Sequence, residues 1–250
     1  YKDEFRLPSG IFLVDKPVGK TSHDMVFEYR RKLDTRKVGH AGALDPFATG
    51  LLIILAGKAL KLSDQFLNLD KEYEAEIAFG FKTDTLDTEG KITEVSSKLV
   101  TQEELEKSFT HFMPEYNQKV PIYSSVKVQG DKLRELARRS DGYKIIEDRI
   151  QFYRGTEVWK DIPLPFKLVK IYELKLIGIK ESHLSDYSFE ENFKNQLKEK
   201  NIKSFQTAKI KVSVSKGTYI RKLAEDIGEV LGVPAMLINL RRTRVGEFRI

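Results

Sequence analysis

Apolar and polar positions recur along the chain with the periods of strands and helices. The apolar run Ile11 to Val14 ends in a Pro/Gly turn, which predicts a short buried strand. The run "LLIIL" at 51–55 predicts a second buried strand. Residues 71–80 alternate, with Tyr73 among the apolar positions, which predicts a half-buried strand. Two further strands are expected at 170–179 and 208–217.

Helical spacing alternates irregularly with these strands. Thr21 or Ser22 can cap a helix that carries Met25 and Val26 on one face. Further helices are expected at 58–67, at 130–140 and at 218–233, with Gly232 as an end signal. Because strands and helices do not follow a strict βαβ order, the pattern predicts an α+β fold. The polar segment 181–204 is expected to be a surface insertion and not a second domain.

Composition narrows the possible functions. The chain has 250 residues and 40% hydrophobic positions, enough for a full core. The 43 Lys+Arg against 37 Asp+Glu give a net charge of +6, which is compatible with a polyanionic partner but does not establish one. The absence of cysteine excludes disulfides, thiol nucleophiles and zinc–cysteine sites. With four scattered histidines, no metal site is expected, and without a long apolar run we expect a cytoplasmic protein with no membrane partner.

One loop concentrates the candidate chemistry. The stretch "GHAGALDPFATG", residues 39–50, places Asp45 among small residues directly before an apolar strand. An Asp-Pro pair is ordinary turn chemistry, which is the simplest interpretation of Asp45 taken alone. The surrounding Gly and Ala residues let a ligand or another backbone approach closely. A rigid strand fixes the loop, which favours a reactive role.

A second stretch, "SKGTYIRKL" at 215–223, lies at a strand-to-helix junction. Lys216 is placed to face a phosphate, Tyr219 to form an aromatic wall, and Arg221 to bind a carboxylate. The alternative is a solvated helix start with a half-buried tyrosine.

Five ordered motifs from residue 10 to 246 resemble those of the TruB family, bacterial enzymes that make pseudouridine in the T loop of tRNA at position 55. "GHAGALDPFATGLLIILAGKALK" resembles the catalytic motif, and "GIFLVDKPVGKTSHD" the N-terminal motif with Lys16-Pro17. "KEYEAEIAFGFKTDTLDTEGKI" resembles the tyrosine motif and its T-D-T-x-D-x-x-G continuation. "PIYSSVKVQGDKLRELAR" resembles the RNA-clasping segment, at about 120–150, and "SKGTYIRKLAEDIG" with "LINLRRTRVG" the closing pair.

The resemblance implies a fold and a set of roles. The fold is a mixed, largely antiparallel central sheet flanked by helices, with the active-site cleft across the sheet. Asp45 matches the essential aspartate, Arg221 the arginine that pairs with it, and Tyr73 the tyrosine that stacks on the flipped base. The positions that match substrate-binding residues are His40, Lys16, Pro17, Tyr219, Leu240 and Lys216. The positions expected to bind RNA phosphates are Lys127, Lys132, Arg134, Arg138 and Arg139.

The resemblance also implies a tRNA T arm as partner, no cofactor, no metal and a monomer. Many family members continue into a C-terminal PUA-type domain, which is expected to be absent or truncated here. Two other functions stay open at this point. One is a tRNA-binding chaperone that would not need Asp45, and the other is a relative that depends on a guide RNA.

Overall fold

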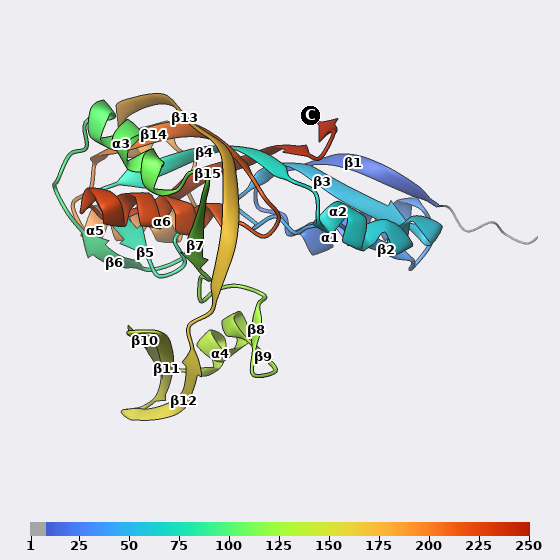
Figure 1. The fold of residues 1–250 in the computed structure, drawn as a ribbon, viewed down its shortest axis with the longest axis horizontal. Helices are drawn as coiled ribbons and strands as arrows, with labels where there is room; N and C mark the ends of the chain where they lie inside the picture. Colours follow the sequence, from blue (N-terminus) through green and yellow to red (C-terminus); the bar gives the residue numbers. More distant parts are fainter. Residues whose placement is uncertain (1–8) are drawn as a thin grey trace, which may run out of the picture.

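The computed structural model describes residues 9–250, and its main element is a nine-stranded mixed sheet (Figure 1). The path through the sheet runs β1-β3-β15-β4-β14-β13-β7, with β2 added to β3 and β16 to β15. Within the described range, β3 and β15 make the one parallel pairing. The strands are β1 (Gly10–Lys16), β2 (Val38–His40), β3 (Thr49–Ala56), β4 (Lys71–Phe79), β7 (Glu115–Lys119), β13 (Phe166–His183), β14 (Ser204–Val214), β15 (Ala235–Val245) and β16 (Phe248–Arg249). This sheet with its helices confirms the predicted α+β class.

Three helices cover one face of the sheet: α1 (Ser22–Lys32), α3 (Gln102–Ser108) and α6 (Ile220–Leu231). Their apolar sides share a buried cluster with alternate residues of the strands, including Leu52 and Ile54 of β3. Thr21 caps α1 by accepting a hydrogen bond from the Asp24 amide, and Gly232 ends α6 with a φ of 65°. The caps and helical faces predicted at these two helices are therefore confirmed.

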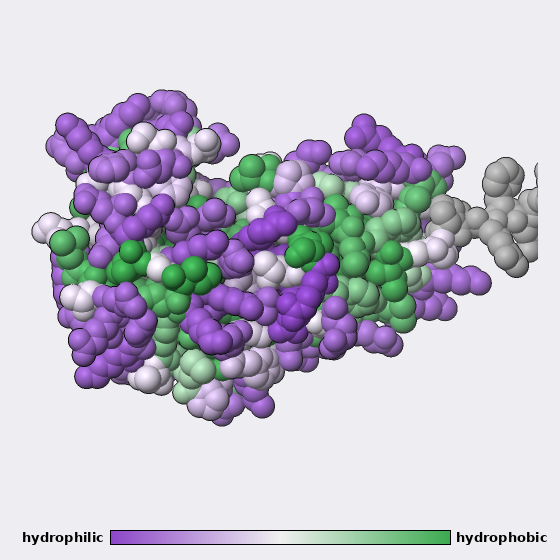
Figure 2. Space-filling view, turned by 90° about the horizontal axis from the view of Figure 1, so that it is seen from above, coloured by the Kyte–Doolittle hydropathy of each residue, from purple (hydrophilic) through white to green (hydrophobic). Residues whose placement is uncertain are grey.

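The opposite face is covered only at its two ends. One end carries the 3₁₀ helix η1 (Gly57–Leu62) and α2 (Ser63–Leu67), and the other carries α5 (Glu191–Glu199). Between them the strands expose charged pairs such as Lys209 with Glu74, 2.8 Å apart. From this side the surface is mainly hydrophilic, and apolar residues gather towards the end where the chain begins (Figure 2).

Two predicted elements differ from the structure. β1 is an edge strand with Ile11 41% and Leu13 45% exposed, so the prediction of a buried strand there was wrong. An edge strand packs on one side only, so an unbroken apolar run does not establish burial. The expected helix at 58–67 is a 3₁₀ helix followed by a short α-helix, η1 and α2.

The polar segment 181–204 contributes to a core. Its helix α5 buries Phe193 and Leu197 against Phe81 and Phe205, with Phe81 in β5 (Phe81–Thr83), which pairs with β6 (Ile92–Val95). The hydrophobic side of α5 therefore closes one end of the sheet, although most of the segment is polar.

A separate unit, residues 120–164, projects from the face that carries α6 (Figure 1). We call it the projecting unit. It contains β8 (Lys127–Val128), β9 (Asp131–Lys132), α4 (Leu133–Arg139), β10 (Gly142–Ile146), β11 (Arg149–Arg154) and β12 (Glu157–Pro163). Leu133 and Leu136 of α4 pack on Ile150 and Phe152 of β11 in a cluster of its own. β7 and β13 connect this unit to the main sheet.

Candidate active site

Asp45 lies in the loop between β2 and β3, and both sides of the loop are anchored in the core. Leu44 and Phe47, its near neighbours, are buried in the main cluster. The Ser22 hydroxyl at the start of α1 accepts a hydrogen bond from the Leu44 amide at 2.8 Å and donates to the Leu44 carbonyl at 3.1 Å. The Asp45 side chain is 42% exposed, so the loop presents this carboxylate at an accessible surface.

Arg242 of β15 binds the backbone of the same loop. It is 2% exposed, and its guanidinium donates to the carbonyls of Leu51, Gly42 and Ala43. Gly50 has a φ of 101°, and a Cβ at this position would overlap the backbone of Arg242. Gly50 thus allows the close packing of β3 on β15, one of the two uses that small residues in this loop were expected to have.

Arg221, the second residue of α6, connects two carboxylates. Its Nε lies 2.9 Å from Oδ2 of Asp45, and its Nη1 lies 3.0 Å from Oδ2 of Asp87. Nη1 also donates to the Thr85 carbonyl at 2.6 Å, and Nη2 to the Tyr123 carbonyl at 3.3 Å. These bonds fix the guanidinium from several directions, so its position does not depend on Asp45.

The contact between Arg221 and Asp45 leaves one carboxylate oxygen free. Oδ2 forms the ion pair with Nε, whereas Oδ1 of Asp45 has no hydrogen-bond partner among residues 9–250. The arrangement can therefore present a carboxylate oxygen to a ligand, as nucleophile or as base.

Asp87 is a site residue that the sequence analysis did not assign. Its side chain is 3% exposed and accepts hydrogen bonds from the Thr85 hydroxyl at 2.6 Å and the Glu89 amide at 3.0 Å. Burial raises the pKa of Asp87, and the charge of Arg221 opposes this rise. Asp87 is the second aspartate of the T-D-T-x-D-x-x-G motif, which was the available signal for it.

Lys16 lies beneath the Asp45 loop. Its ammonium group donates to the carbonyls of Pro17 at 2.9 Å, Lys20 at 2.6 Å and Pro46 at 3.2 Å. Burial lowers the pKa of Lys16 to about 8, and the charge of Asp45 opposes this shift. Lys16 thus stabilises the loop through its bond to the Pro46 carbonyl, whereas Pro17 is exposed.

Tyr73, Leu240 and His40 lie around the same loop. Tyr73 is 8% and Leu240 5% exposed, and both belong to the cluster that contains Leu44 and Phe47. His40 ends β2, and its Nδ1 is buried without a hydrogen-bond partner within the described chain. Burial lowers the pKa of His40, which favours the neutral ring.

Tyr219 and Lys216 lie in the connection between β14 and α6. The Tyr219 amide donates to Gln118 of β7, and its ring packs on the cluster of the projecting unit. Tyr219 therefore links α6 to that unit. Lys216 is exposed, and its Nζ donates to Oδ1 of Asn68 at 2.8 Å.

The five cations predicted to bind RNA all lie on the projecting unit, but not all are available. Lys132 pairs with Glu135 at 2.9 Å, and Arg139 lies 3.9 Å from Asp131 and over the ring of Trp159. Lys127, Arg134 and Arg138 form no ion pair with any residue in 9–250.

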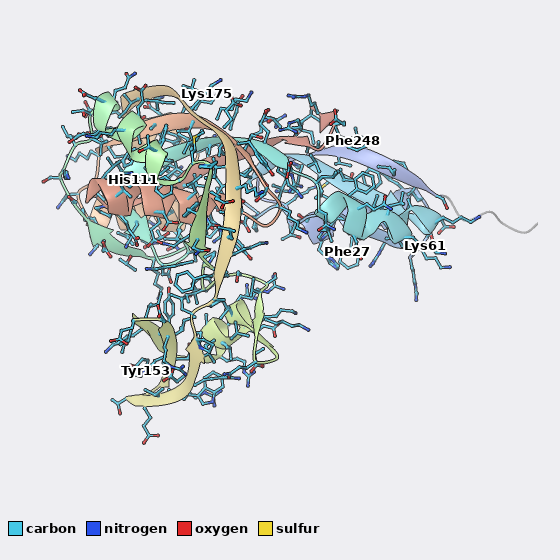
Figure 3. All side chains as sticks on the ribbon, in the orientation of Figure 1. Phe27, Lys61, His111, Tyr153, Lys175 and Phe248 are labelled. Atoms are coloured by element: carbon cyan, nitrogen blue, oxygen red, sulfur yellow. The ribbon has the colours of Figure 1, made fainter. Side chains whose placement is uncertain are left out.

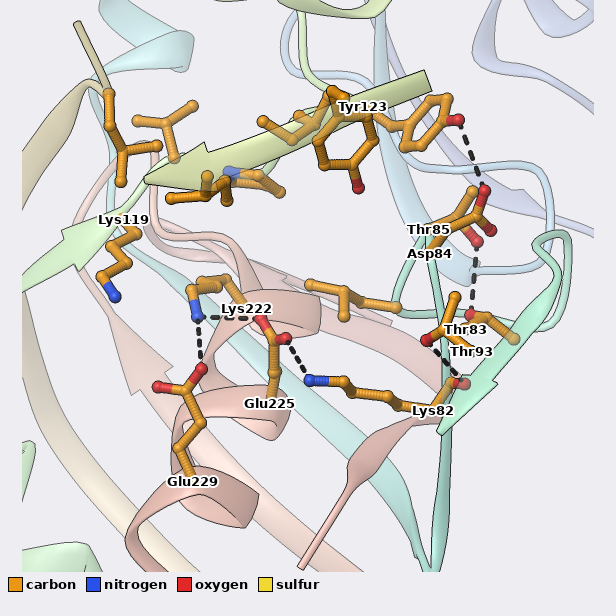
Figure 4. Close-up of a pocket in the computed structure, with 17 residues that line it drawn as sticks. Lys82, Thr83, Asp84, Thr85, Thr93, Lys119, Tyr123, Lys222, Glu225 and Glu229 are labelled. Carbon is orange, nitrogen blue, oxygen red and sulfur yellow. Dashed lines mark hydrogen bonds and ion pairs between the residues drawn. The ribbon is translucent and has the colours of Figure 1, made fainter. Parts of the chain in front are cut away.

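A cavity of about 220 Å³ lies between α6, β5 and the projecting unit (Figure 4). Its walls include Thr85 and Tyr123, whose carbonyls accept hydrogen bonds from Arg221. Asp45 does not line this cavity. Lys222, Lys82 and Glu225 also line the cavity. The Nζ atoms of Lys222 and Lys82 lie 2.8 and 3.2 Å from the carboxylate oxygens of Glu225. The Lys82–Glu225 pair joins β5 to α6, the helix that carries Arg221, whereas the Lys222–Glu225 pair lies within α6.

Comparisons with known proteins find matches over most of the chain. A model described as TruB family pseudouridylate synthase (N terminal domain) matches residues 30–160. A second, tRNA pseudouridylate synthase B C-terminal domain, matches residues 221–250. The chain shares the fold of one chain in the crystal structure of a Cbf5-Nop10-Gar1 complex. The TM-score is 0.62, and the two are 24% identical, over 96% of this chain and 50% of the other. None of the helices in 9–250 is long and apolar enough to span a membrane.

Two curated relatives are each named tRNA pseudouridine synthase B. The protein from Caldicellulosiruptor saccharolyticus is 40% identical over 242 residues, which cover 97% of this chain and 69% of the relative. The protein from Acholeplasma laidlawii is 38% identical over 240 residues, covering 96% and 70%. With two family models matched and relatives at 40% and 38% identity, the protein belongs to the TruB family of pseudouridylate synthases.

Proposed function

We propose that this protein isomerises uridine to pseudouridine in the T loop of tRNA, at position 55, and that Asp45 is the reactive carboxylate. The observation that carries the proposal is the Arg221–Asp45 contact at 2.9 Å, which leaves Oδ1 of Asp45 available. The names of the relatives support tRNA as substrate. The T loop is the target that the sequence motifs imply.

The reaction conserves all atoms of the base. The N1–C1′ bond breaks, the uracil turns, a C5–C1′ bond forms, and the proton leaves C5 while N1 gains one. Oδ1 of Asp45 either attacks C1′, adds to the base, or assists formation of a glycal intermediate. Each route uses a carboxylate oxygen at the reacting base or sugar, which the contact with Arg221 helps to position.

The surroundings of Asp45 suit an extruded nucleotide. A uracil within a folded loop is out of reach, so it must be flipped out at a cost of a few kcal/mol. Tyr73 and Leu240 offer an apolar wall, Tyr219 a second aromatic surface, and the Nδ1 of His40 a hydrogen-bonding atom. Lys127, Arg134 and Arg138 then contact phosphates of the T arm. The reaction needs no cofactor or metal, and we propose that the enzyme works as a cytoplasmic monomer.

Tritium release tests both the reaction and its position. An unmodified tRNA transcript labelled with tritium at uridine C5 is incubated with the protein, and released tritium is counted. We expect about one tritium per tRNA, because a single C5 proton is exchanged for the new bond. A transcript with cytidine at the T-loop position is the matched control and should release none.

Two results would contradict the proposal. Equal release from the control transcript would place the modified uridine elsewhere in the tRNA. Tight binding without release would favour a tRNA chaperone, whereas release only in the presence of an added guide RNA would favour the guide-dependent function.

A further inference from the structure

Three lysines lie beside Tyr73 on the face of the sheet that carries Asp45. Lys71 begins β4, two residues before Tyr73 and directly opposite Val214 of β14. Alternate residues of a strand share a face, so Lys71 and Tyr73 point to the same side. Lys216 follows two residues after β14 ends, and Lys167 is the second residue of β13.

Contacts bring the three ammonium groups to one place. Lys216 donates to Asn68 at 2.8 Å, and Lys71 donates to the carbonyls of Leu67 and Leu69, on either side of Asn68. The Nζ of Lys167 lies directly against Gly217, the residue after Lys216, where a Cβ would overlap it. Gly217 has a φ of 72°, so both its conformation and its missing side chain make room for Lys167.

The positive charge of this group is not balanced by the protein. Within residues 9–250, none of the three lysines forms an ion pair. Burial lowers the pKa of Lys71 to about 8, and the cations Arg242, Lys167 and Lys216 act in the same direction. Asp70 is the neighbouring carboxylate, and it already accepts a hydrogen bond from the Tyr172 hydroxyl at 3.3 Å.

We propose that Lys71, Lys167 and Lys216 form a binding subsite for one phosphodiester group of the substrate RNA, adjacent to the uridine-binding position. The inference rests on the proposed function, because a uridine beside Tyr73 carries a phosphate on each side of its ribose. A buried ammonium group surrounded by further cations is stabilised by an anion. The RNA backbone supplies a phosphate next to each base.

The subsite differs from the cations of the projecting unit in two ways. Its lysines come from the main sheet, on β4, β13 and the segment after β14. Its three lysines lie within electrostatic range of one another, whereas Lys127 lies on β8 and the other two cations, Arg134 and Arg138, on α4. We therefore expect it to position one particular phosphate, while the projecting unit adds affinity along the T arm.

The test compares the double variant Lys167→Gln/Lys216→Gln with Lys175→Gln, measuring equilibrium binding of unfractionated tRNA over a range of salt concentrations. Lys71 stays unchanged, because its ammonium group also binds two carbonyls. Lys175 is the matched control, since it is an exposed lysine of β13 that points away from the projecting unit (Figure 3). One lost phosphate contact should lower the slope of log K against log salt by about 0.7 to 0.9 for the double variant only.

A second experiment identifies the phosphate. Single phosphodiesters of a T-arm hairpin RNA are replaced one at a time by uncharged methylphosphonates. We expect one position next to the target uridine at which the replacement weakens binding to the unchanged protein about tenfold, but leaves binding to the double variant unaltered.

The subsite would be overturned if the double variant kept the salt slope of Lys175→Gln, or if every methylphosphonate weakened both proteins equally. Failure of the proposed function looks different. The unchanged protein would then release no tritium, or would not prefer the T-arm hairpin, while the salt slopes with unfractionated tRNA would still report on the lysines.

Discussion

Nη1 of Arg221 lies 3.0 Å from Oδ2 of Asp87, a carboxylate that is 3% exposed. The same guanidinium reaches the partly exposed Asp45 through Nε. Asp87 therefore holds the residue that in turn contacts Asp45, the carboxylate that we propose to be reactive. This relationship makes the position of Arg221 depend on its planar, forked shape as well as on its charge.

Arg221→Lys should lower the single-turnover rate of tritium release by about 100-fold or more, since one ammonium group cannot replace contacts to two carboxylates and two carbonyls. tRNA affinity should change much less. Arg241→Lys is the control, because Arg241 binds Asp15 at an exposed position. A rate for Arg221→Lys close to that of Arg241→Lys would show that charge alone suffices.

Lys16 should make stability depend on pH. Its pKa is about 8 in the folded protein, whereas an ordinary lysine, as in the unfolded chain, has a pKa of 10.5. The unfolded chain therefore binds more protons between these pH values. Stability from this group therefore rises as pH increases from about 8 to 10.5 and is lost as pH falls through 8. Urea unfolding of the protein and of Lys16→Met should show their difference moving in favour of Lys16 over this range. A stability difference between the two proteins that stayed constant over this pH range would contradict the predicted pH dependence.

Gly50→Ala should destabilise the protein by at least about 3 kcal/mol or prevent folding, because the new Cβ overlaps the backbone of Arg242 in addition to requiring a positive φ. Gly130→Ala is the matched control. Gly130 has a φ of 92° with open space around it, so only the backbone cost of about 1 kcal/mol is expected there. Urea unfolding measures both, and equal losses would show that the β3–β15 packing is not tight.

Arg138→Gln should lower the salt slope of tRNA binding by about 1, as expected for one lost phosphate contact. Its neighbour Arg139 lies near Asp131 and over Trp159, so Arg139→Gln should change the slope less. Filter binding at several salt concentrations measures both slopes. A larger effect at Arg139 would mean that RNA displaces Asp131.

Much of the fold followed from local pattern. The alternation in β4 and the helical spacing of α6 both appear in the structure, because each element buries one continuous face. The order of strands in the sheet could not be derived in the same way. β15 lies between β3 and β4 although it is last but one in the chain, and such long-range pairing leaves no local signal.

The site was predicted in part for a similar reason. Asp45 and Arg221 are far apart in sequence, and only their resemblance to known motifs suggested the contact that the structure shows at 2.9 Å. Asp87 and Arg242 were missed because a charged residue in a polar sequence is usually exposed, whereas these two are buried by their partners. Which cations of the projecting unit are already paired also depends on tertiary contacts, as with Arg139 and Asp131.

The most direct measurement is the single-turnover rate of tritium release by Asp45→Asn, with its tRNA affinity measured in parallel. Asparagine has the shape of aspartate but no ionised oxygen. If Asp45 is the reactive carboxylate, the variant should bind tRNA within about threefold of the unchanged protein and release no detectable tritium. Release at more than about a tenth of the normal rate would show that another group carries out the reaction.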